Sequence, residues 1–269
     1  MARRVLLLDS GLGGLTVLAA VRERLPELAI SYLADSGGFP YGAMTPERLS
    51  GRLLALLPPL AEAQRCAAVV LACNTASTIA LAALREQLAL PVVGVVPPIK
   101  PAAGQSKSRA IGLLATPATA RGAYVDELIA RFAADCTVVR VSASDLAAMA
   151  EAKCRGEPVD MTALRAILAP LFGPDAPPVD AVALGCTHYP LLLDELRAVA
   201  PPQVAWLEPG PAVARRLQEV LAALPADEGD SSAGDVALFT GAPPAAGGPV
   251  AAWLARCGLG HIEHWPAPA

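Results

Sequence analysis

The sequence predicts an α/β protein with two similar lobes, each a mostly parallel sheet flanked by helices, and a candidate site in the cleft between them. Short apolar runs alternate with amphipathic segments along the whole chain, which is typical of buried parallel strands joined by helices. The chain has 269 residues, of which 54% are hydrophobic, so two lobes can each bury a core. Two of the apolar runs also end alike, each at a cysteine.

The chain is organised around residues 69–78, where a run of valine and leucine stops at Cys73. The run is too short for a helix of its own, so we expect a fully buried strand. Ligands of open α/β sheets bind at the carboxyl ends of the strands, which places Cys73 at a cleft. Asn74 and Thr75 follow, and we expect them to open the next helix.

A second apolar run, residues 181–184, leads through Gly185 to Cys186 and continues with Thr187 and His188. It repeats the first arrangement of a buried strand, a thiol and a polar turn. We therefore expect one two-sided site, with a thiol from each lobe.

The first lobe begins with a strand that closes on Asp9 and Ser10, followed by a glycine turn and a helix. The glycines match neither the dinucleotide fingerprint nor the P-loop, so neither ligand is implied, and a tight turn explains them. Thr45 and Pro46 have the character of an N-cap and a first helical turn. This first strand is expected at residues 5–8, and further strands at 30–33 and 91–96. Helices are expected to begin at residues 15, 46 and 74.

The second lobe is expected to begin after a proline- and glycine-punctuated crossing at residues 99–109. We assign residues 1–98 and 207–269 to the lobe that carries Cys73, and residues 99–206 to the lobe that carries Cys186. Expected next are strands at 111–116 and 138–141, helices ending at 132 and spanning 145–153, a returning helix at 212–224, a surface loop at 225–234, a strand at 236–240 and a helix around Trp253.

Composition and charge narrow the classes of partner. The formal net charge is −4 without a basic cluster, so no nucleic acid and no anionic membrane surface is expected, and a small molecule is. The apolar run at the N-terminus is shorter than that of a signal peptide. Residues 66–84 carry no charge, but their central polar cluster argues against a membrane span.

The cysteines indicate a reducing compartment. Six are present, and none forms a CxxC pair or another metal-binding spacing, which favours reduced thiols in the cytoplasm. His261 and His264 flank Glu263, but without further ligands we interpret them as surface residues and expect no metal.

Two thiols facing each other suit inversion at a carbon atom. A thiolate can remove the α-hydrogen of an amino acid, and a thiol on the other face can return a proton to the planar carbanion. Asp9 is placed to serve Cys73, His188 to serve Cys186, and Glu151 to orient His188. The sequence has three lysines and no pyridoxal signature, which favours a route without a cofactor.

Four segments carry recognisable motifs: residues 9–15, 40–42, 72–77 and 185–190. Together, and in this order over nearly the whole chain, they resemble the glutamate racemases of the aspartate/glutamate racemase superfamily. Residues 94–102 and 128–133 are similar to the proteobacterial branch in particular. The resemblance implies pyridoxal-independent interconversion of L- and D-glutamate, which supplies D-glutamate for peptidoglycan and thereby cell shape.

The resemblance also assigns roles. The first cysteine of the family handles the proton of D-glutamate and the second that of L-glutamate, which makes Cys73 and Cys186 the acid-base pair. A homodimer is implied as well. Asp9, Glu151 and His188 would assist, and the substrate contacts would be Asp9, Ser10, Tyr41, Gly42, Asn74, Thr75, Thr187 and His188.

The chain departs from the family's pattern at two places that flank the site. Ser36 stands where relatives usually carry threonine or asparagine, and Glu208 and Pro209 stand where many carry aspartate and serine. Some relatives have a longer leader, tied to activation by a cell-wall precursor. We expect this chain to lack it, because Asp9 lies almost at its start.

Three alternatives stay open from the sequence. The first is a sister enzyme that acts on aspartate, a hydantoin or a malonate. The second is a hydrolase that acts covalently through Cys186 and His188, which would leave Cys73 idle. The third is a binding role, since some glutamate racemases are reported to inhibit DNA gyrase.

Overall fold

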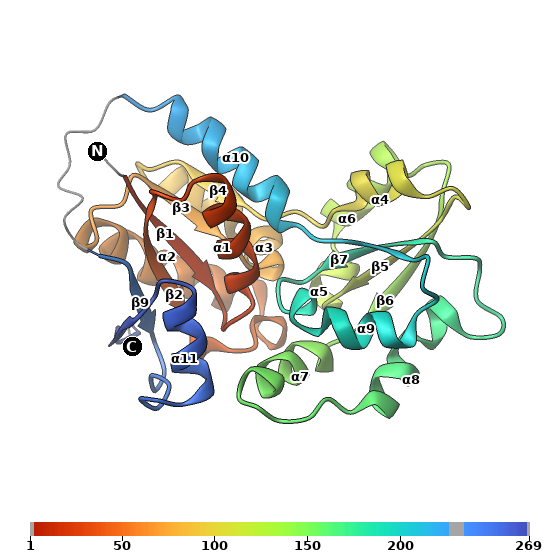
Figure 1. Ribbon diagram of the computed structural model, residues 1–269. Helices are drawn as coiled ribbons and strands as arrows, with labels where there is room; N and C mark the ends of the chain where they lie inside the picture. Colours follow the sequence, from red (N-terminus) through yellow and green to blue (C-terminus); the bar gives the residue numbers. More distant parts are fainter. Residues whose placement is uncertain (1–2, 226–233, 268–269) are drawn as a thin grey trace. The chain divides into compact units, whose positions relative to one another are not determined.

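The computed structural model describes residues 3–225 and 234–267, so most of the loop expected at 225–234 lies outside the described residues. The chain divides into two compact units (Figure 1). Unit 1 comprises Met1–Val95 and Gly210–Ala269, and unit 2 comprises Val96–Pro209.

Unit 1 is built on a six-stranded sheet in which the paired strands are all parallel. Its strands are apolar and almost wholly buried, except at the β10 edge. In spatial order they are β10 (His261–His264), β9 (Val236–Phe239), β2 (Ala29–Ala34), β1 (Arg4–Asp9), β3 (Ala68–Leu71) and β4 (Val92–Gly94).

Helices cover both faces of this sheet because its crossovers run in two directions. The chain moves from β1 to β2 toward one edge and from β2 to β3 toward the other, and right-handed crossovers then place the two connecting helices on opposite faces (Figure 1). One face carries α1 (Gly14–Arg24), α10 (Gly210–Ala222) and α11 (Pro249–Arg256), and the other carries α2 (Pro46–Ala63) and α3 (Asn74–Gln87). As expected, the Thr45 hydroxyl caps α2 by accepting from the Arg48 N–H.

Unit 2 has a four-stranded parallel sheet with the order β6 (Thr137–Ser142), β5 (Ala110–Ala115), β7 (Ala181–Gly185) and β8 (Ala205–Leu207). Two hydrophobic cores flank this sheet, one on each face. One core includes α4 (Ile99–Gln105) and α6 (Ala123–Phe132), and the other includes α7 (Asp145–Cys154), α8 (Met161–Phe172) and α9 (Leu193–Val199). The short helix α5 (Pro117–Ala120) follows β5.

The two sheets share one strand order, which confirms the expectation of similar, parallel α/β lobes. The sequence β2, β1, β3, β4 in unit 1 corresponds to β6, β5, β7, β8 in unit 2. The direction of winding reverses between β1 and β3 in unit 1 and between β5 and β7 in unit 2. Such a switch point is where open α/β sheets bind ligands. Cys73 and Cys186 follow the equivalent strands β3 and β7, so each thiol lies beside a switch point.

Several elements were not expected from the sequence. The crossing at residues 99–109 contains helix α4, whereas we expected an irregular segment, and α8, α9, β8 and β10 also had no counterpart among the expectations. The uncharged stretch at 66–84 consists of strand β3, a turn and most of helix α3. Within the described residues, none of the helices has the length and apolar composition needed to cross a membrane.

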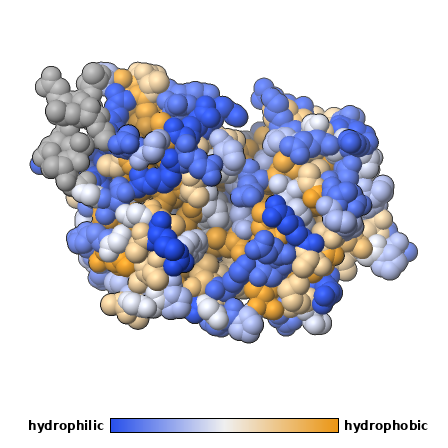
Figure 2. Space-filling model, in the orientation of Figure 1, coloured by the Kyte–Doolittle hydropathy of each residue, from blue (hydrophilic) through white to orange (hydrophobic). Residues whose placement is uncertain are grey.

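The visible surface is mixed in character. Figure 2 shows polar side chains over much of one face, with apolar residues interspersed among them. Among the described residues, the exposed large hydrophobic side chain is that of Tyr124, on α6.

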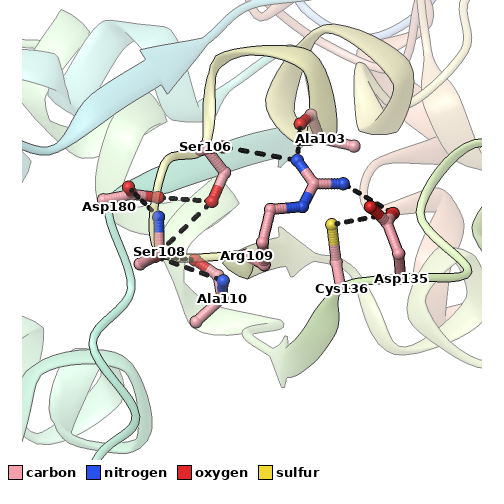
Figure 3. Close-up of polar contacts among 8 residues, drawn as sticks. All are labelled: Ala103, Ser106, Ser108, Arg109, Ala110, Asp135, Cys136 and Asp180. Atoms are coloured by element: carbon pink, nitrogen blue, oxygen red, sulfur yellow. Dashed lines mark hydrogen bonds and ion pairs between the residues drawn. The ribbon is translucent and has the colours of Figure 1, made fainter.

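One carboxylate accepts several hydrogen bonds at the N-terminal ends of the strands of unit 2 (Figure 3). Asp180 accepts hydrogen bonds from the Ser106 hydroxyl at 2.6 Å and from the Lys107 and Ser108 N–H groups at 2.8 Å each. Burial opposes ionisation of Asp180, but these hydrogen bonds outweigh it and lower its pKa from 3.8 to about 2. Asp180 therefore fastens the turn that leads from α4 into β5.

We expect the D180N variant to be less stable than the wild type by about 1–2 kcal/mol near neutral pH, because hydrogen bonds to an ionised acceptor are lost. The lowered pKa sets the pH dependence: the contribution of Asp180 is fully present above pH 3.8 and is lost as the pH falls toward about 2. Urea titrations from pH 6 to pH 3 should show a difference in midpoint that is largest above pH 4 and shrinks below it. A difference that stayed constant would assign the loss to something other than the charge.

Candidate active site

The Cys73 half of the candidate site lies where β1 and β3 end side by side. Leu8 pairs with Leu71, and the Ala72 N–H donates to the Leu8 carbonyl at 2.8 Å. This register brings Asp9 and Ser10 next to Cys73. All three are buried, with exposures of 0%, 4% and 7%, so the polar groups lie in the protein interior and not on an open surface.

The turn after β1 is built for close approach. The Asp9 carboxylate accepts from the Gly11 N–H at 2.8 Å, and the Tyr32 hydroxyl donates to the Gly11 carbonyl at 2.7 Å. A Cβ at Gly14 would lie 2.7 Å from the Asp9 Cβ, which is too close for any side chain. Glycine at this position therefore allows α1 to begin directly against Asp9.

The Cys73 thiol occupies the N-cap position of α3, a helix of 14 residues. The N-terminus of a helix favours negative charge, because its N–H groups and dipole point toward it. Asn74 and Thr75 form the first turn, as expected, and are 2% and 3% exposed. Both polar atoms of the Asn74 amide are buried without a hydrogen-bond partner. A buried amide of this kind is costly unless a ligand satisfies it.

The Tyr41 and Gly42 loop is held in place by a buried carboxylate that the sequence did not reveal. Asp35, fully buried at the end of β2, accepts from the Tyr41 hydroxyl at 2.6 Å. Arg52 on α2 donates to the same carboxylate through Nε at 2.6 Å and through Nη2 at 2.5 Å, and the Thr240 hydroxyl after β9 also donates to it. Burial, and then the Asp35 charge, raise the pKa of Tyr41 well above its ordinary value. Its hydroxyl therefore stays protonated and engaged with Asp35.

Ser36, one of the two departures from the family pattern, has a local partner. Its hydroxyl accepts from the Gly241 N–H at 3.0 Å, and the neighbouring Gly37 N–H donates to the Thr240 hydroxyl at 3.0 Å. Threonine and asparagine also offer an oxygen acceptor. Serine therefore supplies the same chemistry for joining the loop to the end of β9.

We expect R52Q to lower the free energy of unfolding of unit 1 by about 3 kcal/mol, because it leaves the Asp35 carboxylate buried without its counter-charge. The double variant D35N/R52Q removes the charge as well and should recover much of the loss. Urea titration of the two variants beside the wild type measures both effects. If the double variant were no more stable than R52Q, the unpaired charge would not be the cause.

The Cys186 half of the candidate site is a line of three side chains. The Cys186 sulfur lies 3.9 Å from Nδ1 of His188, and Nε2 of His188 lies 2.9 Å from the Glu151 carboxylate on α7. Cys186 and His188 are 6% and 2% exposed. The contact that we expected between Glu151 and His188 is present, and it fixes the orientation of the imidazole relative to the thiol.

The backbone around Cys186 is also tightly constrained. A Cβ at Gly185 would lie 2.8 Å from the Ala115 Cβ on β5, so only glycine fits before the cysteine. Thr187 is 1% exposed, and the buried Tyr189 hydroxyl donates to the Ala143 carbonyl at 2.6 Å. Tyr189 opens the 3₁₀ turn η3 (Tyr189–Leu192), which carries the chain from the thiol into α9.

The structure thus groups the predicted residues by unit. Asp9, Ser10, Tyr41, Gly42, Cys73, Asn74 and Thr75 belong to unit 1, and Glu151, Cys186, Thr187 and His188 to unit 2. His261 contacts Glu263 at 2.7 Å on an exposed strand, in agreement with its interpretation as a surface residue. The Asp35, Arg52 and Thr240 cluster was missed because its members are far apart in sequence; a charged residue directly after a buried strand was the signal for Asp35.

The chain is similar to known racemases in sequence and in fold. The model of the family Asp/Glu/Hydantoin racemase matches residues 16–217. A glutamate racemase of Shewanella sp. (strain MR-7) is 42% identical over 268 residues, which are 98% of this chain and 97% of the relative. A glutamate racemase of Vibrio cholerae is 47% identical over 218 residues, which are 81% of this chain and 80% of the relative.

A solved structure is similar over the whole chain. The Escherichia coli glutamate racemase, crystallised with L-glutamate and the activator UDP-MurNAc-ala, has a TM-score of 0.92 and 39% identity, and the match covers 100% of both chains. The chain therefore belongs to the Asp/Glu/Hydantoin racemase family. Within it the protein is a racemase enzyme whose similarity is to glutamate racemases, including those of proteobacteria, as the sequence predicted.

Proposed function

We propose that the protein interconverts L- and D-glutamate by proton transfer at the α-carbon, with two thiols and no cofactor. The observation that carries the proposal is the repetition of one device: a cysteine after the equivalent strand of each unit, beside its switch point. The names of the similar proteins supply the substrate, since relatives at 42% and 47% identity are glutamate racemases.

Cys73 takes the α-proton of D-glutamate. Its position at the N-cap of α3 favours the thiolate that removes the proton, and Asp9, buried beside it, assists the transfer. The electron pair of the broken C–H bond stays on the planar carbanion and is shared with the carboxylate. Cys186 then delivers its thiol proton to the opposite face and becomes the thiolate.

The reverse reaction begins at Cys186. Its thiolate removes the α-proton of L-glutamate while Cys73 holds the proton to be returned. His188, 3.9 Å from the sulfur and held by Glu151, supports the charge that appears on Cys186. A turnover from D- to L-glutamate leaves Cys73 protonated and Cys186 as the thiolate, the reverse of the starting state. The next turnover in the same direction therefore needs a proton transfer with solvent.

Several buried polar groups are assigned to the substrate. The Asn74 amide, unpartnered on both polar atoms, and the buried Ser10 and Thr75 hydroxyls suit the carboxylates and amine of an amino acid. In unit 2 Thr187 and His188 take the same role. Tyr41 and Gly42 contribute through the loop itself, because the Tyr41 hydroxyl already donates to Asp35.

The first test is exchange of the α-hydrogen in heavy water, followed by proton NMR, without added pyridoxal or metal. L- and D-glutamate and L- and D-aspartate are offered separately. We expect exchange with inversion for both glutamate enantiomers and little for aspartate. Exchange of aspartate alone would overturn the substrate, and no exchange of any of the four would overturn the reaction.

Two variants test the thiols. C73A and C186A should each lower racemisation of glutamate in both directions by at least about 100-fold, since each removes one acid-base group. C66A, a buried cysteine of unit 1, and C136A, a half-buried cysteine of unit 2, are the matched controls and should keep activity. Retained racemisation in either C73A or C186A would rule out a mechanism with two thiols.

The proposal extends to the setting of the enzyme. D-glutamate is supplied for peptidoglycan, and hence for cell wall and cell shape, by a cytoplasmic homodimer. The similarity to glutamate racemases of Shewanella, Vibrio and Escherichia coli supports this setting. Glutamate is the small-molecule partner, and no nucleic acid or membrane partner is proposed.

A further inference from the structure

Helix α7 carries Glu151, so the place of this helix determines how His188 is held. Glu151 meets His188 through a contact of 2.9 Å, and His188 directly precedes the turn η3. The relation between Glu151 and the Cys186 thiol therefore depends on how α7 packs against η3, two elements that are in contact.

Three polar contacts join the α7 region to η3. The Tyr189 hydroxyl donates to the Ala143 carbonyl just before the helix, and Glu151 contacts His188 in its second half. At the end of the helix, Lys153 Nζ donates to the Leu191 carbonyl at 2.9 Å and to Glu195 on α9 at 2.7 Å. Lys153 is the charged member of this set that no step of the proposed reaction uses.

Lys153 and Glu151 contact the segment after Cys186 at separate points. Successive residues of an α-helix are turned by about 100°, so Lys153 and Glu151 leave α7 on different sides. Glu151 contacts His188, and Lys153 contacts the Leu191 carbonyl and Glu195. Lys153 and Glu195 are 32% and 20% exposed, which makes their ion pair partly shielded from water. The Arg155 guanidinium lies 4.0 Å from the Glu151 carboxylate, but its side chain is 53% exposed and it also pairs with Glu157. Lys153 is thus the better-anchored cation near the end of α7.

We propose that Lys153 is a positioning residue of the Cys186 half-site, which holds the end of α7 to η3 and thereby sets Glu151 against His188. The proposal rests on the proposed function only for its kinetic readout. It predicts that loss of Lys153 acts through Glu151, and that it has no separate effect on the reaction.

A double-mutant cycle tests this dependence. We expect K153M to lower kcat/KM for glutamate racemisation about tenfold, because a small displacement of an orienting group is costly. The E151Q/K153M variant should be no more than about twofold worse than E151Q alone, as expected for two changes in one pathway. Losses that simply multiply would overturn the proposal, as would full activity of K153M.

Control variants separate positioning from general stability. K153R keeps donors for the Leu191 carbonyl and Glu195 and should recover most of the activity. E195Q removes the charge of the Lys153 ion pair and leaves its contact with the Leu191 carbonyl, so it should have an intermediate effect. D135N is its matched control, because it removes the charge of the Arg109 and Asp135 pair at the N-terminal ends of β5 and β6, whereas α7 follows the C-terminal end of β6, and it should leave kcat/KM unchanged.

A second readout needs no substrate. The chain has three histidines, and His261 and His264 are exposed, so the imidazole signals of His188 in a proton NMR spectrum are those that disappear in H188N. In K153M these signals should move toward their positions in E151Q, whereas D135N should leave them in place. Unmoved signals in K153M would contradict the proposal. If the wild type failed to racemise glutamate, the proposed function would fail while this measurement still decided the role of Lys153.

Discussion

Parallel pairing of two strands is the constraint on which the candidate site depends. Hydrogen bonds fix the register of β1 against β3 and of β5 against β7, and they do so at the strand ends that carry the polar residues. Asp9 therefore lies next to Cys73, where β1 and β3 end side by side. The strands are buried and apolar, so a shift in register would move the whole core as well as the site.

The two thiols occupy equivalent places but have different surroundings. Cys73 opens a helix of 14 residues, and its neighbours in α3 are uncharged. Cys186 lies before the short 3₁₀ turn η3 and has beside it an imidazole that is in contact with a carboxylate. The neighbourhood of Cys73 is thus a helix N-terminus, whereas that of Cys186 includes side chains from two elements of unit 2.

Most of the strands and the parallel α/β class could be predicted because buried strands leave an apolar run in the sequence. Helix α4 was missed because its proline, Pro101, was interpreted as part of an irregular crossing. Helix α8 had no counterpart among the expectations, and it contains Pro170. Strand β10 was missed because its His and Glu residues are exposed and form no apolar run, although it pairs with β9. The contact between Glu151 and His188 could be anticipated, since both follow from strand ends and helix placement. The hydrogen bonds from Arg52 and Thr240 to Asp35 could not be anticipated, because only the folded chain brings residues 35 and 240 together.

Unit 1 is discontinuous, and this has a consequence for the order of assembly during synthesis. Strand β9 pairs with β2, yet its residues are made only after all of unit 2. Until then the β2 strand presents an unpaired edge, and the Asp35 carboxylate lacks the Thr240 donor. Unit 2 is continuous in sequence and can acquire its core first, within the growing chain. The nascent protein therefore passes through a stage in which one unit is closed and the other has an open edge that a second chain can pair with.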